Sequence, residues 1–126
     1  MHSYGALLSA ISRAEVDFVV IGGLAVGANG YVRATKDVDI VIPRDSENSR
    51  RLAELLARMG AVRPDDSPIP EGMPDGESFL RARTLLGVLD VLPAGDSPLD
   101  YATMRSRAHR STIDDASVWV VDLATL

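Results

Sequence analysis

Two aspartates in one apolar strand are the feature that most constrains this chain. The segment Asp37–Ile42 reads DVDIVI, and its β-branched residues predict a strand. Residues i and i+2 of a strand share a face, so Asp37 and Asp39 point to one side, and Val38, Ile40 and Ile42 point to the other. Like charges on one face repel each other. We therefore expect a positive group between the two carboxylates.

A third aspartate interrupts another apolar strand, because Asp90 lies within the sequence VLDVL. Burying an unpaired carboxylate is costly, so Asp90 needs either a cation or hydrogen-bond donors. An ion pair with an arginine such as Arg33 or Arg81 is one solution. A metal site is the other: if the two acidic strands are neighbours, three carboxylates converge, and hard oxygen ligands select Mg²⁺ or Mn²⁺.

A glycine pair, Gly22-Gly23, follows the apolar run DFVVI. A strand–GG–helix turn lets backbone N–H groups approach a phosphate closely. Arg33 and Lys36 precede the first acidic strand and could offset the charge of a triphosphate. Taken singly, a glycine pair is usually a turn, and two alternate aspartates are often a solvated strand end. In this order and on strands, the three features together indicate two-metal phosphoryl transfer.

The remaining pattern predicts alternating helices and strands. Helices are expected at 6–14, 24–28, 45–59 and 99–108, and strands at 17–21, 37–42, 79–83, 87–92, 111–113 and 118–121. The helix at 45–59 is the clearest, because Asp45 or Ser46 can cap it and Gly60 can end it. Residues 64–78 are rich in Pro, Gly and Asp and predict a loop that need not be ordered. This order indicates an α/β (α+β) fold with a mixed β-sheet and helices packed on it.

Length and composition limit the class of protein. The chain has 126 residues and no cysteine, so we expect one domain over 1–126 without disulfides or thiolate zinc sites, in keeping with a cytoplasmic protein. Its first residues lack the basic segment and long apolar run typical of a signal peptide, and no apolar run approaches the ~20 residues that span a bilayer, so no membrane partner is expected. The net charge is −5. A polyanionic partner would therefore need a local basic patch or bound metal.

These motifs resemble those of the nucleotidyltransferases of the DNA polymerase β-like superfamily. Its pattern is a hydrophobic strand, G-G or G-S, about a dozen residues, D-h-[D/E]-h with h hydrophobic, and a later h-[D/E]-h. Here these are VVIGG, the gap 24–36, DVDI and LDV. Within the superfamily, GGLAV…RATKDVDIVI and LLGVLDVLP look most like the AbiEii-type group, which includes toxins of type IV toxin–antitoxin pairs. The resemblance covers roughly 17–123.

The resemblance implies a minimal nucleotidyltransferase fold and a Mg²⁺-dependent enzyme of the EC 2.7.7 type, which transfers a nucleoside monophosphate from an NTP to a hydroxyl. Asp37 and Asp39 would bind two Mg²⁺ ions, for which Mn²⁺ could substitute. Asp90 would complete the second metal site and help to deprotonate the hydroxyl. The residues implied at the nucleotide are Gly22, Gly23, Arg33, Thr35 and Lys36, with the glycines at the triphosphate.

The acceptor stays open at this point. It could be an RNA 3′ end or a protein, with a cognate antitoxin as partner, or a small molecule such as an antibiotic. A non-catalytic module that binds a nucleotide or a partner is the alternative. Family members usually continue into a C-terminal helical region with a lysine, which we expect this domain to lack. The residue after the glycine pair is Leu24 rather than serine, which removes one possible phosphate-binding hydroxyl.

Several basic and aromatic side chains have two interpretations. Arg81 and Arg83 share a strand face and could contact acceptor phosphates, although a solvated edge is the simpler interpretation. A basic cluster could bind RNA, although a charged outer face is simpler. This cluster consists of Arg105, Arg107, His109 and Arg110. Tyr101 and Trp119 are expected in the core.

Overall fold

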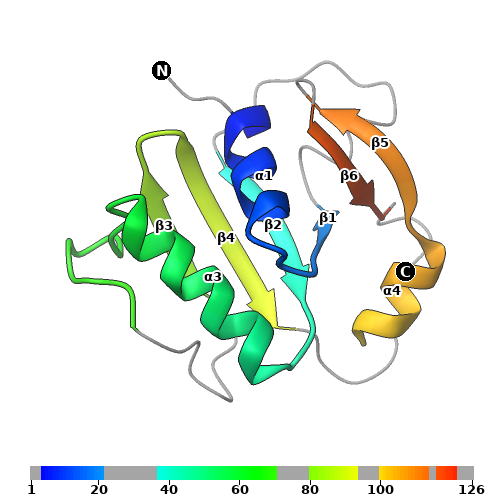
Figure 1. Ribbon diagram of the computed structural model, residues 1–126, viewed down its shortest axis with the longest axis horizontal. Helices are drawn as coiled ribbons and strands as arrows, with labels where there is room; N and C mark the ends of the chain where they lie inside the picture. The colour runs from blue at the N-terminus through cyan, green and yellow to red at the C-terminus, as the bar shows by residue number, and fades with distance from the viewer. Residues whose placement is uncertain (1–3, 22–36, 71–79, 94–99, 114–115, 122–126) are drawn as a thin grey trace.

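The protein is described by a computed structural model that covers residues 4–21, 37–70, 80–93, 100–113 and 116–121. Within these ranges, six strands form one sheet that is flanked by three helices (Figure 1). The helices are α1 (Tyr4–Arg13), α3 (Ser46–Arg58) and α4 (Tyr101–Arg107). The strands are β1 (Val19–Ile21), β2 (Asp37–Ile42), β3 (Leu80–Thr84), β4 (Gly87–Pro93), β5 (His109–Ile113) and β6 (Ala116–Val120).

The sheet is mixed, with the strand order β3-β4-β2-β1-β6-β5. Strands β2 and β4 are parallel, as are β1 and β6, whereas β1 and β2 are antiparallel. Two antiparallel hairpins, β3–β4 and β5–β6, form the edges. The mixed sheet that the sequence predicts is confirmed.

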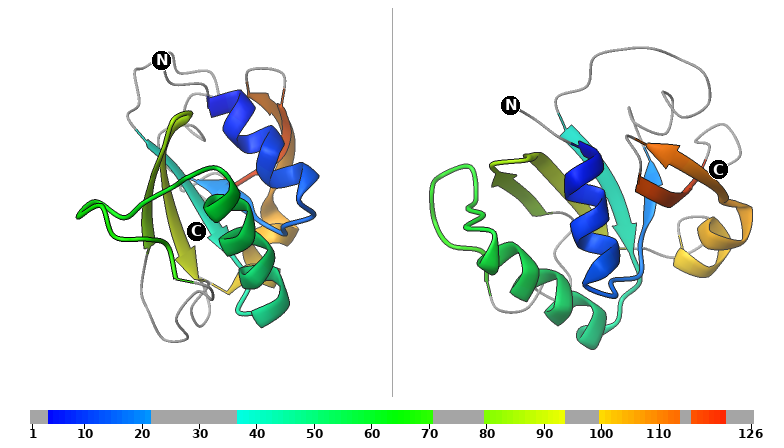
Figure 2. Two further views of the ribbon diagram at one scale, coloured as in Figure 1. Left: turned by 60° about the vertical axis from the view of Figure 1, so that its left-hand side comes forward. Right: turned by 45° about the horizontal axis from the view of Figure 1, so that its top comes forward.

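Helices α1 and α3 lie on the same face of the sheet (Figures 1 and 2). Their apolar stripes meet the alternate apolar residues of the central strands in the main core, and each fully buried aliphatic side chain contributes about 1.5–3 kcal/mol. Its fully buried members include Leu7, Leu8, Ile11, Leu52, Leu56, Val38, Ile40, Leu89 and Val91. This packing fixes which face of β2 and β4 meets the main core and places Asp39 and Asp90 on the other face.

Helix α4 packs on a second core, where Met104 contacts a cluster that includes Val19, Val41 and Val121. Val19 and Val41 alternate along β1 and β2 with Val20 and Ile40 of the main core, so α4 covers part of the opposite face of the sheet. No helix in the described ranges combines the length and the apolar character needed to cross a bilayer.

Local signals explain where the elements begin and end. The Asp45 side chain accepts a hydrogen bond from Asn48 N at 3.0 Å and caps α3, and Gly60 follows its end with a φ of +70°. Helix α4 is shorter than predicted, because Asp100 caps it and Ala108 is already extended. Strand β5 is longer than the predicted 111–113, because pairing with β6 extends to His109.

The loop after α3 is partly regular. Val62 forms isolated bridges with Pro68 and with Arg83, and Arg63 N donates to Ser67 O at 2.9 Å. The first part of the predicted 64–78 loop is therefore tied to the outer edge of β3. The rest of that loop and the predicted helix at 24–28 lie outside the described residues.

Candidate active site

The acidic residues of two strands lie side by side. Strands β2 and β4 are adjacent and parallel, and Asp39 is the register partner of Asp90. Register partners in a sheet point to the same face, and their neighbours Val38 and Leu89 belong to the main core on the other face. Asp39 and Asp90 therefore share the sheet face opposite α1 and α3.

A third strand brings an arginine into the same row. On β3, Arg81 is the register partner of Asp90. Its Nε donates to Asp90 Oδ1 at 2.8 Å, and its Nη2 donates to Oδ2 at 3.0 Å. Arg81, Asp90 and Asp39 thus form one row across β3, β4 and β2, which we call the charged row.

Burial makes this ion pair necessary. Asp90 is 4% exposed, whereas the side chain of Arg81 is 46% exposed. The bidentate contact offsets the cost of removing the carboxylate from water. The sequence left Arg33 and Arg81 as alternative ion-pair partners for Asp90, and Arg81 is a partner.

Arg81 lies on an edge strand with its side chain 46% exposed, as a solvated edge predicts, but it also pairs with a buried carboxylate. Arg83, two residues further along the same strand, forms an ion pair with Asp66 instead. Both of these side chains remain largely exposed, at 45% for Arg83 and 82% for Asp66. The two arginines share a strand face but compensate different carboxylates, one buried and one exposed.

The other predicted site residues are only partly within the description. The backbone of Asp37 lies in β2 and pairs with Val88, while its side chain is outside the described part. The predicted nucleotide-binding residues all lie outside the described ranges. They are Gly22, Gly23, Arg33, Thr35 and Lys36.

The donor chemistry of the charged row suits a divalent cation. Asp39 and Asp90 offer hard carboxylate oxygens of the kind that Mg²⁺ and Mn²⁺ prefer. Among the described side chains, no group of three or more His, Cys, Asp or Glu could hold a metal, so a third ligand would have to come from beyond them. The predicted third ligand, Asp37, is such a residue. The carboxylates of Asp39 and Asp90 are thus suitable ligands for a divalent cation, and Arg81 is already bound to Asp90.

A second polar region lies around α4 and β6. The guanidinium of Arg105 stacks 3.4 Å from the ring centroid of Trp119, and that of Arg110 lies 4.7 Å from it. These residues line a groove of about 510 Å³ together with Asp17 and Tyr101. Desolvation and the charge of Asp17 raise the pKa of Tyr101.

This arrangement refines the expectations for the basic cluster and the aromatic residues. Tyr101 and Trp119 pack against the second core but are only partly buried. Arg105 and Arg110 come from α4 and β5 and converge on Trp119, as cation–π contacts allow. The spacing of these arginines in the sequence does not reveal that contact.

Comparison with known proteins gives a fold-level match. No family model and no curated protein matches the sequence. The crystal structure of ANT(2″)-Ia in complex with adenylyl-2″-tobramycin superposes with a TM-score of 0.63 and 19% identity, covering 94% of this chain and 69% of that one. The crystal structure of a Thermotoga maritima protein assigned to the nucleotidyltransferases superposes with a TM-score of 0.64 and 13% identity. The match covers 97% of this chain and 79% of that one.

The chain has the nucleotidyltransferase fold. The solution structure of the antibiotic-resistance factor ANT(2″)-Ia agrees, with a TM-score of 0.63, 18% identity and coverage of 94% of this chain and 65% of that one. The minimal nucleotidyltransferase fold predicted from the motifs is confirmed. At these identities the likeness concerns the fold alone, so the AbiEii-type grouping stays a prediction.

Proposed function

We propose that this protein is a metal-dependent nucleotidyltransferase that moves a nucleoside monophosphate from an NTP to a hydroxyl acceptor. The observation that carries the proposal is the register pairing of Asp39 with Asp90 on one face of a nucleotidyltransferase fold. Opposed acids on neighbouring strands destabilise a sheet unless positive charge lies between them. A site for divalent cations gives this pairing a function.

The proposed roles follow the carboxylates. Asp37, Asp39 and Asp90 would hold two Mg²⁺ ions, with Mn²⁺ as a substitute. Such ions, when bound, stabilise the charge on the attacking and leaving oxygens of a phosphoryl transfer. Asp39 would contribute to this ion site from β2 and Asp90 from β4, on the sheet face that the two register partners share.

The reaction balances without a further reactant. The acceptor oxygen forms a bond to the α-phosphorus, the bond from that phosphorus to the bridging oxygen breaks, and pyrophosphate leaves with the electron pair. The proton of the acceptor hydroxyl passes to a carboxylate, a role that we assign to Asp90. The proposed triphosphate contacts are made by Gly22, Gly23, Arg33, Thr35 and Lys36.

Two acceptor classes follow from different observations. The similarity to ANT(2″)-Ia, solved with adenylyl-2″-tobramycin, favours a small-molecule hydroxyl such as that of an aminoglycoside. The sequence resemblance to AbiEii-type toxins favours an RNA 3′ end or a protein hydroxyl, with a cognate antitoxin as partner. The acceptor is thus the part of the proposal that experiment must assign.

The test is a transfer assay with each α-labelled NTP, Mg²⁺, and separate pools of total RNA, total protein and aminoglycosides. We expect label in one pool, and a loss of at least 100-fold in Asp39→Ala, because removing a metal ligand removes charge stabilisation from the transition state. Asp66→Ala, which removes an exposed carboxylate outside the charged row, is the matched control. NTP binding without transfer to any pool would instead indicate a non-catalytic nucleotide-binding module.

The toxin assignment has its own test. If the protein is the toxin of a type IV pair, its expression slows bacterial growth, and Asp39→Ala relieves the effect at equal protein level. Equal toxicity of the two proteins would exclude a toxin that acts through this site.

A further inference from the structure

The Asp90 carboxylate is already bound at both of its oxygens before any cation arrives. Arg81 binds both of its oxygens, at 2.8 and 3.0 Å. We propose that Arg81 is the resident counter-ion of Asp90 and competes with the divalent cation for that carboxylate, so that it weakens cation binding at the site. The inference rests on the proposed function, because it concerns the same metal site.

Geometry favours competition over joint binding. The side chain of Asp90 is 5% exposed, so few directions of approach to its oxygens remain. A cation at Asp90 would lie close to the guanidinium, and two positive charges repel strongly where water is largely excluded. One of the two therefore has to move away from the carboxylate.

Arg81 is the group that can move. It lies on β3, an edge strand, and its side chain is 46% exposed, so its guanidinium can leave Asp90 and remain hydrated. Asp90 lies on β4, between β3 and β2, with its side chain almost fully buried. A cation entering from the Asp39 side would thus displace Arg81 towards the outer edge of the sheet.

The ion pair also explains how the site folds without metal. An uncompensated carboxylate at 4% exposure would destabilise the protein. Arg81 supplies the compensating charge until a cation takes its place. The same contact therefore stabilises the metal-free protein and limits the affinity for metal.

The direct test is Mn²⁺ titration without nucleotide, with free Mn²⁺ followed by electron paramagnetic resonance. We expect Arg81→Gln to bind Mn²⁺ about ten-fold more tightly than wild type, and Arg81→Lys to lie between them, because lysine keeps the charge but lacks the bidentate fork. Arg83→Gln is the matched control. Arg83 lies on the same strand and face as Arg81 but pairs with Asp66. The Mn²⁺ affinity of Arg83→Gln should therefore equal that of wild type.

Thermal unfolding gives a second readout. In EDTA, Arg81→Gln should melt below wild type and below Arg83→Gln, and saturating Mn²⁺ should raise its melting temperature by more than that of wild type. An equal Mn²⁺ shift in Arg81→Gln and wild type would overturn the competition.

Asp90→Asn separates this inference from the proposed function. One outcome excludes the competition but leaves the metal site standing: wild type binds Mn²⁺, the Asp90→Asn variant fails to bind it, and neither Arg81 variant binds it more tightly than wild type. If no variant and no wild-type protein binds Mn²⁺, both proposals fail. Tighter binding in Arg81→Gln than in wild type, with Arg83→Gln unchanged, supports both.

Discussion

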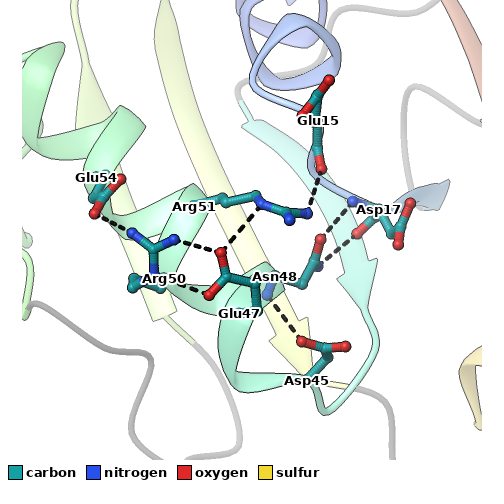
Figure 3. A network of polar contacts seen from close by, with 8 residues as sticks. All are labelled: Glu15, Asp17, Asp45, Glu47, Asn48, Arg50, Arg51 and Glu54. Carbon is teal, nitrogen blue, oxygen red and sulfur yellow. Dashed lines mark hydrogen bonds and ion pairs between the residues drawn. The ribbon is translucent and has the colours of Figure 1, made fainter.

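The carboxamide of Asn48 forms two hydrogen bonds with the backbone of Asp17, 31 residues earlier in the chain (Figure 3). Asp17 N donates to Asn48 Oδ1 at 2.6 Å, and Asn48 Nδ2 donates to Asp17 O at 3.0 Å. Asn48 is only 3% exposed. This contact ties the first turn of α3 to the segment that leads into β1, the strand beside β2.

We therefore expect Asn48→Ala to destabilise the protein by about 2 kcal/mol, because two backbone groups lose their partners. Asn48→Asp should be at least as damaging, since a carboxylate can accept from Asp17 N but cannot donate to Asp17 O. Chemical denaturation measures both effects, with Ser46→Ala, an exposed change in the same turn, as the control. A loss below 0.5 kcal/mol, the usual limit for surface changes, in Asn48→Ala would contradict the role of the contact.

Gly87 begins β4 in a backbone conformation that other residues rarely adopt. Its φ is +135°, and an added Cβ would lie 3.0 Å from the ring of Tyr4. Gly87→Ala should therefore cost about 1–3 kcal/mol. Combining Gly87→Ala with Tyr4→Ala in a double-mutant cycle should remove the steric contribution to this loss of stability. The contribution from backbone strain at Gly87 should remain.

Gly60 is the control for that prediction. It also has a positive φ, of +70°, but an added Cβ would have nothing within 4 Å. Gly60→Ala should cost only about 1 kcal/mol. If the two glycines tolerate alanine equally well, crowding by Tyr4 is not what selects glycine at the start of β4.

Substituting Arg81 should destabilise the protein more than substituting Asp90, its partner in the ion pair. Arg81→Met leaves a buried carboxylate without its partner and should cost about 2–3 kcal/mol in metal-free buffer, somewhat less than for a fully buried pair. Asp90→Asn leaves a half-exposed guanidinium that water can solvate, so it should cost less. Urea denaturation of both variants in EDTA decides the order, and the reverse order would show that Arg81 is not the main compensation for Asp90.

The cap of α4 predicts a pH dependence. Hydrogen bonds from the Thr103 hydroxyl and Thr103 N lower the pKa of Asp100 below its ordinary value of 3.8. A carboxyl with a lowered folded-state pKa contributes stability above its unfolded pKa and loses it as the pH falls through the folded value. The stability difference between wild type and Asp100→Asn should thus be constant from pH 5 to 7 and shrink below about pH 4, as measured by thermal unfolding. A difference that grows on acidification would contradict this assignment.

Local features of the sequence predicted much of the fold. The helical spacing in α1 and α3, the cap at Asp45, the stop at Gly60 and the apolar run of β2 each depend on neighbours within a few residues. The alternation in DVDIVI likewise placed Asp39 on the face of its strand opposite Val38, Ile40 and Ile42. These features depend on backbone geometry that is the same in any fold.

Only the tertiary structure decided which side chains lie beside Asp39 and Asp90. That β2 and β4 are adjacent, parallel and in the register that opposes Asp39 to Asp90 depends on pairing between distant segments, and periodicity carries no information on which strands pair. The sequence could offer Arg33 and Arg81 to Asp90 only as alternatives, and the β3–β4 register brought Arg81 to it. The convergence of Arg105 and Arg110 on Trp119 has the same origin. Side chains from separate elements meet only when the sheet and α4 have packed.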